Sequence, residues 1–209
     1  MTTVKGDAES ALTVKKSRFL GFACRAETER QALDALETRR KRFFDASHHC
    51  YAYMLDNGVS RFSDDGEPSG TAGRPILEAI TKSGLTDIIV VCTRYFGGTL
   101  LGAGGLARAY FQCAWDTLMA ARKIELVPSL TYRLTLPYDL WARALNALKK
   151  AGCIIEDAVY SENITAKICV SEGSAENALR QLKEVTMGQA VPEFIGTKLA
   201  EISRDSEGH

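Results

Sequence analysis

The segment Leu130-Thr-Tyr-Arg-Leu-Thr-Leu136 alternates apolar and polar side chains, which predicts a β-strand with one buried face. A helical pattern follows over 137–151 and ends at Gly152, a residue type common just after helices. Two more strand patterns, 153–160 and 164–170, are joined by a short hairpin connection. The segment therefore begins a strand–helix–strand–strand unit.

A second helix and a last strand complete this region. Ser174 is placed to cap the helix, which ends by Gly188, and 191–202 has the pattern of a strand. The order βαββαβ over 130–202 is the split βαβ, or ferredoxin-like, arrangement.

The part before residue 126 has a different pattern of helices and strands, which predicts a separate α+β domain. A capping box at Thr28–Gln31 opens its first helix. The other expected elements are strands over 18–25, 49–55 and 88–96, and helices over 75–82 and 103–121. Pro128 is expected to end whatever precedes it, so the predicted domains are 1–126 and 127–209. Residues 1–9 and 204–209 are expected to be frayed tails.

Composition excludes several classes of protein. The 209 residues are 45% apolar and 25% charged, unlike a disordered or collagen-like chain. Lys plus Arg and Asp plus Glu are both 26, so bulk charge does not indicate a strongly basic nucleic-acid binder, although a local basic patch stays possible. No apolar run is long enough for a membrane span, and the N-terminus lacks the apolar core of a signal peptide.

The six cysteines lie in predicted regular structure and form no Cys-x-x-Cys pair. This pattern favours reduced thiols and a cytoplasmic protein, and it gives no reason to expect zinc. No cofactor is predicted.

An acidic loop, Arg61-Phe-Ser-Asp-Asp-Gly-Glu-Pro-Ser-Gly-Thr-Ala-Gly-Arg-Pro75, lies between strong elements. Loops of this length in a compact domain are usually functional or disordered. One interpretation is a structured turn that caps the next helix. The other is a ligand-facing loop in which Ser69, Thr71 and backbone amides bind a phosphate or carboxylate. Its three carboxylates could hold a hard cation, but their spacing is not that of an EF-hand and no metal is required.

A glycine-rich loop, Arg94-Tyr-Phe-Gly-Gly-Thr-Leu-Leu-Gly-Ala-Gly-Gly-Leu-Ala107, precedes the last helix of the first domain. Its Gly-x-Gly-x-x-Ala pattern superficially resembles a dinucleotide fingerprint, but the glycines do not follow the strand directly. The glycines allow the backbone to approach closely either a phosphate or the neighbouring acidic loop. Arg74 and Arg94 adjoin these loops where phosphate contacts are usually made.

Ser47-His48-His49-Cys50 enters a predicted strand, so the two histidines should point to opposite faces and cannot bind one metal together. For the same reason His49 and Cys50 do not form a nucleophilic pair. One histidine, assigned as His49, is expected in the cleft with the two loops. The basic run at 39–42 is interpreted as a solvated helix face.

The predicted binding residues share a position in or beside the two loops, and no catalytic or metal-binding residue is assigned. The candidates for ligand or nucleic-acid binding are Arg61, Ser63, Asp64, Asp65, Glu67, Ser69, Thr71, Arg74, Arg94, Gly97, Gly98, Gly102, Gly104, Arg108 and His49.

The two loops resemble the signature of the YigZ/IMPACT family, and Lys16–Phe19 and Ala46–Cys50 resemble its N-terminal segments. The resemblance covers 12–122, and the second half resembles the small ferredoxin-like domain of bacterial members. It implies an N-terminal domain like the second domain of a small-subunit ribosomal protein and a C-terminal domain like the last domain of elongation factor G. Eukaryotic members act in translational control by protein binding and carry an additional N-terminal domain, for which the residues before 12 leave no room.

The resemblance implies no catalytic residues, so we expect a cytosolic, non-enzymatic, translation-linked regulator. Its expected partners are RNA, the ribosome or a translation-regulatory protein, and no membrane. The alternative is a protein or enzyme that binds a phosphorylated compound or nucleotide through the two loops, with the acids, Ser69 and Thr71 meeting the ligand.

Overall fold

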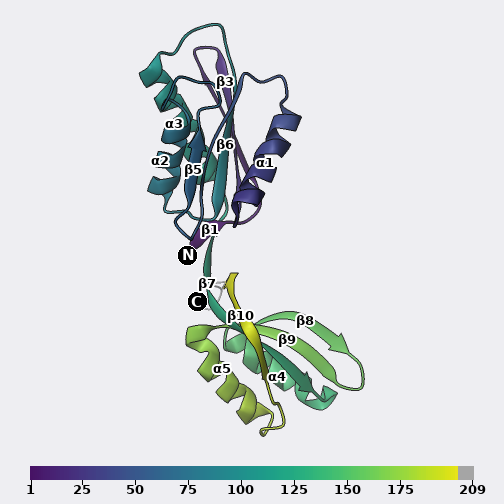
Figure 1. The fold of residues 1–209 in the computed structure, drawn as a ribbon. Helices are drawn as coiled ribbons and strands as arrows, with labels where there is room; N and C mark the ends of the chain where they lie inside the picture. Colours follow the sequence, from purple (N-terminus) through teal and green to yellow (C-terminus); the bar gives the residue numbers. More distant parts are fainter. Residues whose placement is uncertain (202–209) are drawn as a thin grey trace. The chain divides into compact units, whose positions relative to one another are not determined.

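The computed structural model describes residues 1–201 and divides into two compact units, one spanning Met1–Ile124 and one that starts at Glu125 (Figure 1). The division lies close to the predicted boundary at 126. Strand β7 (Lys123–Leu136) continues through Pro128, which does not end an element as expected. Pro128 lies opposite Leu199, and pairing with the other neighbour of β7 begins only at Ser129. The missing N–H of Pro128 therefore removes no hydrogen bond on that side.

The first unit is built on an antiparallel sheet in the order β2-β3-β6-β4-β5. The strands are β2 (Ala8–Val14), β3 (Ser17–Arg25), β6 (Ile88–Tyr95), β4 (His48–Met54) and β5 (Ser60–Ser63). The central strand β6 is buried from Ile88 to Arg94, as its apolar sequence predicts.

Helices cover both faces of this sheet (Figure 1). The pair α2 (Gly73–Ser83) and α3 (Ala103–Ala120) packs on one face through residues such as Ile76 and Tyr110, and α1 (Glu29–Arg42) packs on the other through Leu36. Thr28 caps α1 by accepting the backbone N–H of Gln31 at 3.2 Å, as the capping box predicts. The two sheet faces are therefore separately buried.

Two predictions about this unit are wrong. Residues 1–9 are not a frayed tail, because they form β1 (Thr2–Val4), which pairs with β7, and the start of β2. The acidic loop is not wholly irregular, because its first residues belong to the edge strand β5. Short edge strands carry a weak apolar pattern, since one side of each is open to solvent. The predicted tail at 204–209 lies outside the described residues.

The second unit has the sheet order β10-β7-β9-β8, with every neighbouring pair antiparallel. Its other elements are α4 (Tyr138–Lys150), β8 (Ile154–Tyr160), β9 (Ile164–Ser171), α5 (Glu172–Val185) and β10 (Glu193–Glu201). The two helices bury Trp141 and Leu182 against the sheet. Ser171 rather than Ser174 occupies the N-cap of α5. The ferredoxin-like order and the α+β class are confirmed.

A tight turn between β2 and β3 lies against the glycine-rich loop. Lys15 and Lys16 have φ values of 45° and 69°, as both central residues of a type I′ hairpin turn do. A Cβ built on Gly97 would lie 2.1 Å from the carbonyl carbon of Lys16 and 2.4 Å from the backbone nitrogen of Ser17. Only a glycine allows these two backbone segments to touch.

We expect Gly97→Ala to destabilise the protein by about 1–3 kcal/mol or more, because the added methyl group meets backbone that cannot move aside. Gly104→Ala is the matched control from the same loop, since its Cβ would meet only the end of Arg108 at 3.7 Å. That variant should be neutral or stabilising by up to about 1 kcal/mol. Urea unfolding of the two variants measures the difference, and equal stabilities would contradict the close approach at Gly97.

Candidate functional site

A buried ion pair joins the acidic loop to the sheet. The Nη1 of Arg94, at the end of β6, lies 2.6 Å from Oε1 of Glu67. The hydroxyl of Tyr110, from α3, donates to the same oxygen at 2.7 Å. Glu67 is 8% exposed and Arg94 is 4% exposed. Both charges are therefore neutralised within the protein.

Arg94 also fixes the start of β3 and the glycine-rich loop. Its Nη2 donates to Oγ of Ser17 at 3.2 Å, and the backbone N–H of Gly97 donates to the same oxygen at 3.2 Å. The guanidinium carbon lies 5.4 Å from the ring centroids of Phe19 and Phe96. Arg94, which was predicted to contact phosphate, is thus a buried structural residue in this structure.

Asp64 caps the amino end of α2. Its carboxylate accepts the backbone N–H groups of Gly70 at 2.8 Å and of Ala72 and Gly73 at 2.9 Å. Burial alone would raise the pKa of Asp64, but the three N–H donors outweigh it and hold that pKa below its ordinary value. The amides that were predicted to bind an anion are occupied by a carboxylate of the chain itself. The hydroxyl of Thr71 is also engaged, donating to the carbonyl of Pro68 at 2.6 Å.

Asp65 connects the acidic loop to α1 and β4. One carboxylate oxygen accepts from Nη2 of Arg40 at 2.9 Å, and the other accepts the backbone N–H of His49 at 2.7 Å. Asp65 has a φ of 43° and Gly66 a φ of 86°, so the chain turns through two left-handed residues here. Asp64 and Asp65 together fix both sides of this turn.

The two histidines point to opposite faces of the sheet, as predicted. His48 lies on the face of the buried ion pair, with its Nε2 3.9 Å from Oε1 of Glu67 and its Nδ1 2.8 Å from the carbonyl of Asp65. His49 lies on the α1 face, where its Nδ1 is 3.1 Å from Oγ1 of Thr93. Burial lowers the pKa of His49 below its ordinary value, although Asp65 opposes this. His48, and not the predicted His49, is the histidine beside Glu67.

Ser17, His48 and the hydroxyl of Tyr110 also belong to this cluster, although none of them was predicted from the sequence. Strand alternation contains the signal for His48, because it shares a face with Cys50 and the apolar core. The contacts of Ser17 and Tyr110 join residues 77 and 43 positions from their partners, which local patterns do not encode.

The buried cluster contains no activated nucleophile. The Sγ of Cys50 donates to the carbonyl of Asp64 at 3.0 Å. Burial, reinforced by the carboxylates of Glu67, Asp65 and Asp64, raises the pKa of the Cys50 thiol well above its ordinary value. Burial also raises the pKa of Tyr110. Both groups stay protonated at neutral pH, so this arrangement stabilises the loop and offers no thiolate for chemistry.

The remaining candidates lie around this cluster or away from it. Apart from Arg61, those in or next to the loops that stay exposed are Ser69, Arg74, Gly98, Gly102, Gly104 and Arg108. Ser63 accepts the N–H of Asp65 at 3.2 Å. Arg61 pairs with Glu29 of α1 at 3.1 Å and does not join the cluster. Arg108 and Lys15 line a small cavity of about 340 Å³ beside the amino end of α3.

Within residues 1–201, no three His, Cys, Asp or Glu side chains are grouped as a metal site requires. All six cysteines are free thiols. No helix in the same range combines the length and apolar character that a membrane span needs.

Comparison with known proteins identifies both parts of the chain. The model of the Impact N-terminal domain matches residues 15–118, and that of a domain of unknown function, DUF1949, matches 134–189. The IMPACT family member YvyE of Bacillus subtilis is 34% identical over 190 residues, which cover 90% of this chain and 88% of YvyE. An IMPACT family member of Thermus thermophilus is 36% identical, with 84% of this chain and 97% of that protein covered.

One solved structure, a crystal structure of a hypothetical protein, covers 93% of this chain and 97% of its own, with 27% identity and a TM-score of 0.62. The structure of the two-domain translational regulator Yih1 covers 56% of this chain and 48% of its own at 26% identity, with a TM-score of 0.38, which is too low for the folds to be compared.

We expect Glu67→Gln to cost about 3–5 kcal/mol of stability, because it leaves the buried Arg94 without a counter-charge. The double variant Glu67→Gln with Arg94→Met removes both charges and should cost less than the single variant. Glu78→Gln, which breaks an exposed pair with Lys82, serves as the control and should cost about 0–1 kcal/mol. Denaturant unfolding measures all three, and a Glu67→Gln cost as small as that of the control would contradict the role of the pair.

We expect Asp64→Ala to lower stability by about 1–2 kcal/mol at pH 7, the usual effect of losing a helix cap. The folded pKa of Asp64 lies below its ordinary value of 3.8, so its stabilising effect is complete above that value and is lost as pH falls through the folded pKa. The difference between wild type and variant should therefore narrow below about pH 4. Thermal unfolding from pH 7 to pH 3 measures this, with the exposed Asp34→Ala as control. A difference independent of pH would exclude the charged cap.

Proposed function

The chain belongs to the IMPACT family, and from this premise we propose that it is a non-enzymatic, translation-linked regulator that binds RNA or the ribosome. The family resemblance implies domains like those of a ribosomal protein and of elongation factor G, and this supports a partner of this class. The match to the Impact N-terminal domain includes both the acidic and the glycine-rich loop.

The strongest structural support is the internal pairing of the charged groups in the acidic loop. Asp64 is bonded to backbone N–H groups, Asp65 to Arg40, and Glu67 to Arg94. A loop held this firmly is suited to presenting a fixed surface, and its buried thiol is unsuited to nucleophilic chemistry. Arg74 and Arg108 remain exposed beside it as cations that a phosphate can reach.

One observation favours a second candidate function, the binding of a small phosphorylated ligand. The cavity of about 340 Å³ beside the amino end of α3 combines apolar side chains with the cations Lys15 and Arg108. A ligand that binds there must raise thermal stability. Stabilisation by nucleotides or phosphorylated metabolites without RNA binding would favour this candidate over the first.

Co-sedimentation with ribosomes and with total RNA at two salt concentrations tests the proposal. We expect the wild type to bind, and Arg74→Ala with Arg108→Ala to weaken binding about tenfold at low salt while reducing its salt dependence, because phosphate contacts release counterions. Arg94 is unsuitable for this test, since its loss would break the buried ion pair. Arg30→Ala with Lys82→Ala removes the same charge from other surfaces and should bind as the wild type does.

If the wild type associates with neither ribosomes nor RNA at low salt, where phosphate contacts are strongest, the proposal fails.

A further inference from the structure

A basic groove lies between the carboxyl end of α1, the edge strand β2 and its neighbour β3. It has a volume of about 410 Å³, and its charged lining residues are Arg18, Arg39, Arg42 and Glu9. Arg39 and Arg42 belong to the basic run that the sequence analysis interpreted as a solvated helix face. The structure gives these residues different environments, and Arg39 is not solvated.

The side chain of Arg39 is buried in this groove and held in place by its neighbours. Its side chain is 4% exposed, and its guanidinium carbon lies 4.6 Å from the ring centroid of Phe22 and 4.5 Å from that of Phe43. Its Nη1 lies 2.5 Å from Oε1 of Glu9, whereas its buried Nε has no hydrogen-bond partner within the described part of the chain. A buried guanidinium held between two aromatic rings gives the groove a fixed positive charge.

The charges in the groove are unequal. Oε1 of Glu9 is shared between Arg39 and Nη1 of Arg42, which lies 3.1 Å away. Arg18, from β3, adds a third guanidinium, so three positive charges face one negative charge. Basic residues in the last turn of α1 are expected, because they complement the helix dipole. The helix dipole does not explain Arg18, because this residue belongs to β3 and not to α1.

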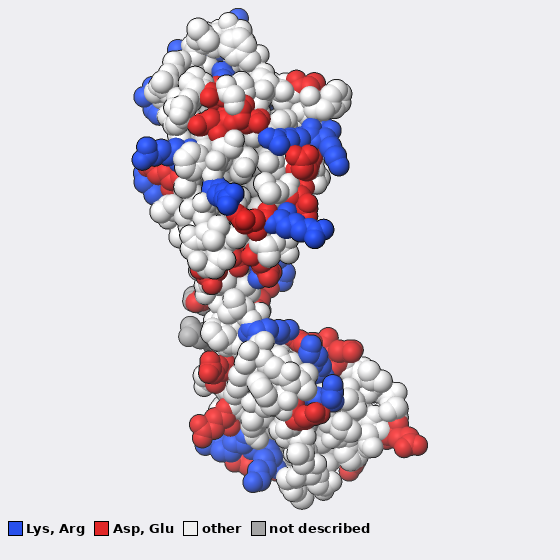
Figure 2. Space-filling model, viewed as in Figure 1, with Lys and Arg blue, Asp and Glu red and all other residues white. Residues whose placement is uncertain are grey.

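An exposed aromatic side chain follows the basic run. Phe44, two residues after Arg42, is 86% exposed. Single-stranded nucleic acids stack their bases on exposed aromatic rings of this kind. Figure 2 shows Lys and Arg side chains gathered over the end of α1 where this segment begins.

We propose that this basic groove binds the phosphate backbone of single-stranded RNA, with Arg18 and Arg42 contacting phosphates and Phe44 stacking on a base. The inference rests on the proposed function and gives it a defined site, separate from the acidic and glycine-rich loops. Arg39 supplies buried positive charge beneath the contacts. Arg40 lies outside the groove, because it is engaged by Asp65.

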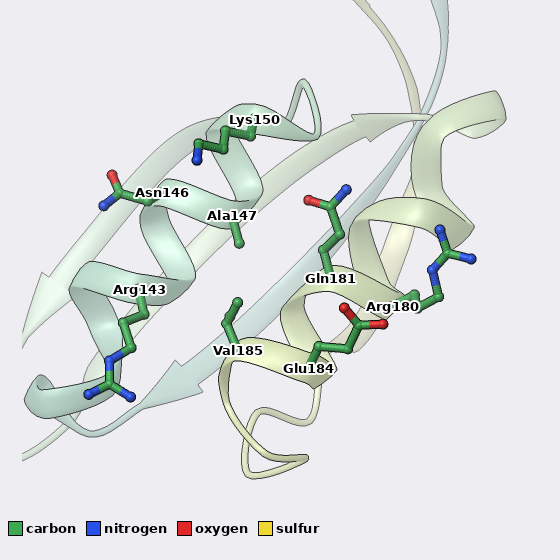
Figure 3. A pocket seen from close by; sticks show the side chains of 8 residues that line it. All are labelled: Arg143, Asn146, Ala147, Lys150, Arg180, Gln181, Glu184 and Val185. Atoms are coloured by element: carbon green, nitrogen blue, oxygen red, sulfur yellow. The ribbon is translucent and has the colours of Figure 1, made fainter.

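A second basic surface, between α4 and α5, is a weaker candidate. It has a volume of about 560 Å³ and includes Arg143, Lys150 and Arg180. Figure 3 shows that Arg143 and Arg180 extend away from each other, so they do not converge on one phosphate. Arg180 is bonded to Asn177 on its own helix.

Fluorescence anisotropy with a labelled single-stranded oligouridylate at two salt concentrations tests the proposal. We expect Arg18→Ala with Arg42→Ala to weaken binding at least tenfold and to reduce the salt slope by about 1.4, the value for two phosphate contacts on a single strand. Phe44→Ala should weaken binding about five- to a hundredfold with an unchanged salt slope, because stacking releases no counterions. Both variants alter exposed side chains and should keep the wild-type unfolding temperature.

Four comparisons decide the outcome. Arg30→Ala with Lys82→Ala removes equal charge elsewhere and should bind as the wild type does. If the groove variants bind RNA normally while Arg74→Ala with Arg108→Ala does not, the groove is overturned and the proposed function stands. If the wild type binds neither RNA nor ribosomes, both fail. If a double-stranded RNA binds equally well and Phe44→Ala has no effect, the single-stranded, stacked mode is wrong.

Discussion

The ion pair between Glu67 and Arg94 is the interaction on which the first unit depends. Removing two charges from water costs several kcal/mol for each, and the pair is favourable only where further hydrogen bonds complete it. Tyr110 supplies one such bond and Ser17 another. The four residues come from the acidic loop, β6, α3 and β3, so the pair can form only when these elements have already met. The conformations of both loops therefore depend on the correct packing of β3, β6 and α3 at this end of the sheet.

The acidic loop is held by its own acids. Asp64 satisfies the amino end of α2, and Asp65 joins the loop to α1 through Arg40 and to β4 through a backbone N–H. Most of the acidic residues in the family's signature motif therefore stabilise the structure of the loop itself. A sequence motif can contain residues that hold the fold together as well as residues that contact a ligand, and the motif alone does not distinguish them. In the proposed function, ligand contact is therefore assigned to exposed side chains outside this network, namely Arg74, Arg108 and Arg18.

The sequence predicts the elements well where one periodic pattern is buried on one side. The alternation of 130–136 is of this kind, and the continuous apolar run at 88–92 is equally clear because both of its faces are buried. The order of elements then determines the ferredoxin-like sheet. It predicts less where the deciding contact is distant. Asp64 lies six to nine residues from the amides it caps, and Ser17 lies 77 residues from Arg94. The burial of Arg39 is hidden in the same way, because a basic run alone does not show that Phe22 and Phe43 enclose one of its members.

Charge balance limits how this protein can bind an anionic partner. With equal numbers of acidic and basic residues, the chain generates little long-range attraction, so encounter with RNA is not strongly steered. The proposed binding therefore relies on a few contacts whose geometry is fixed before the partner arrives. The acidic loop satisfies each of its carboxylates internally, with backbone N–H groups at Asp64 and with arginines at Asp65 and Glu67, whereas the basic groove sets three guanidinium groups against Glu9. The groove therefore has a local excess of positive charge on a molecule that is neutral overall, and aromatic rings hold one of its cations in place. Such a site favours a nucleic-acid strand of a particular geometry over any polyanion.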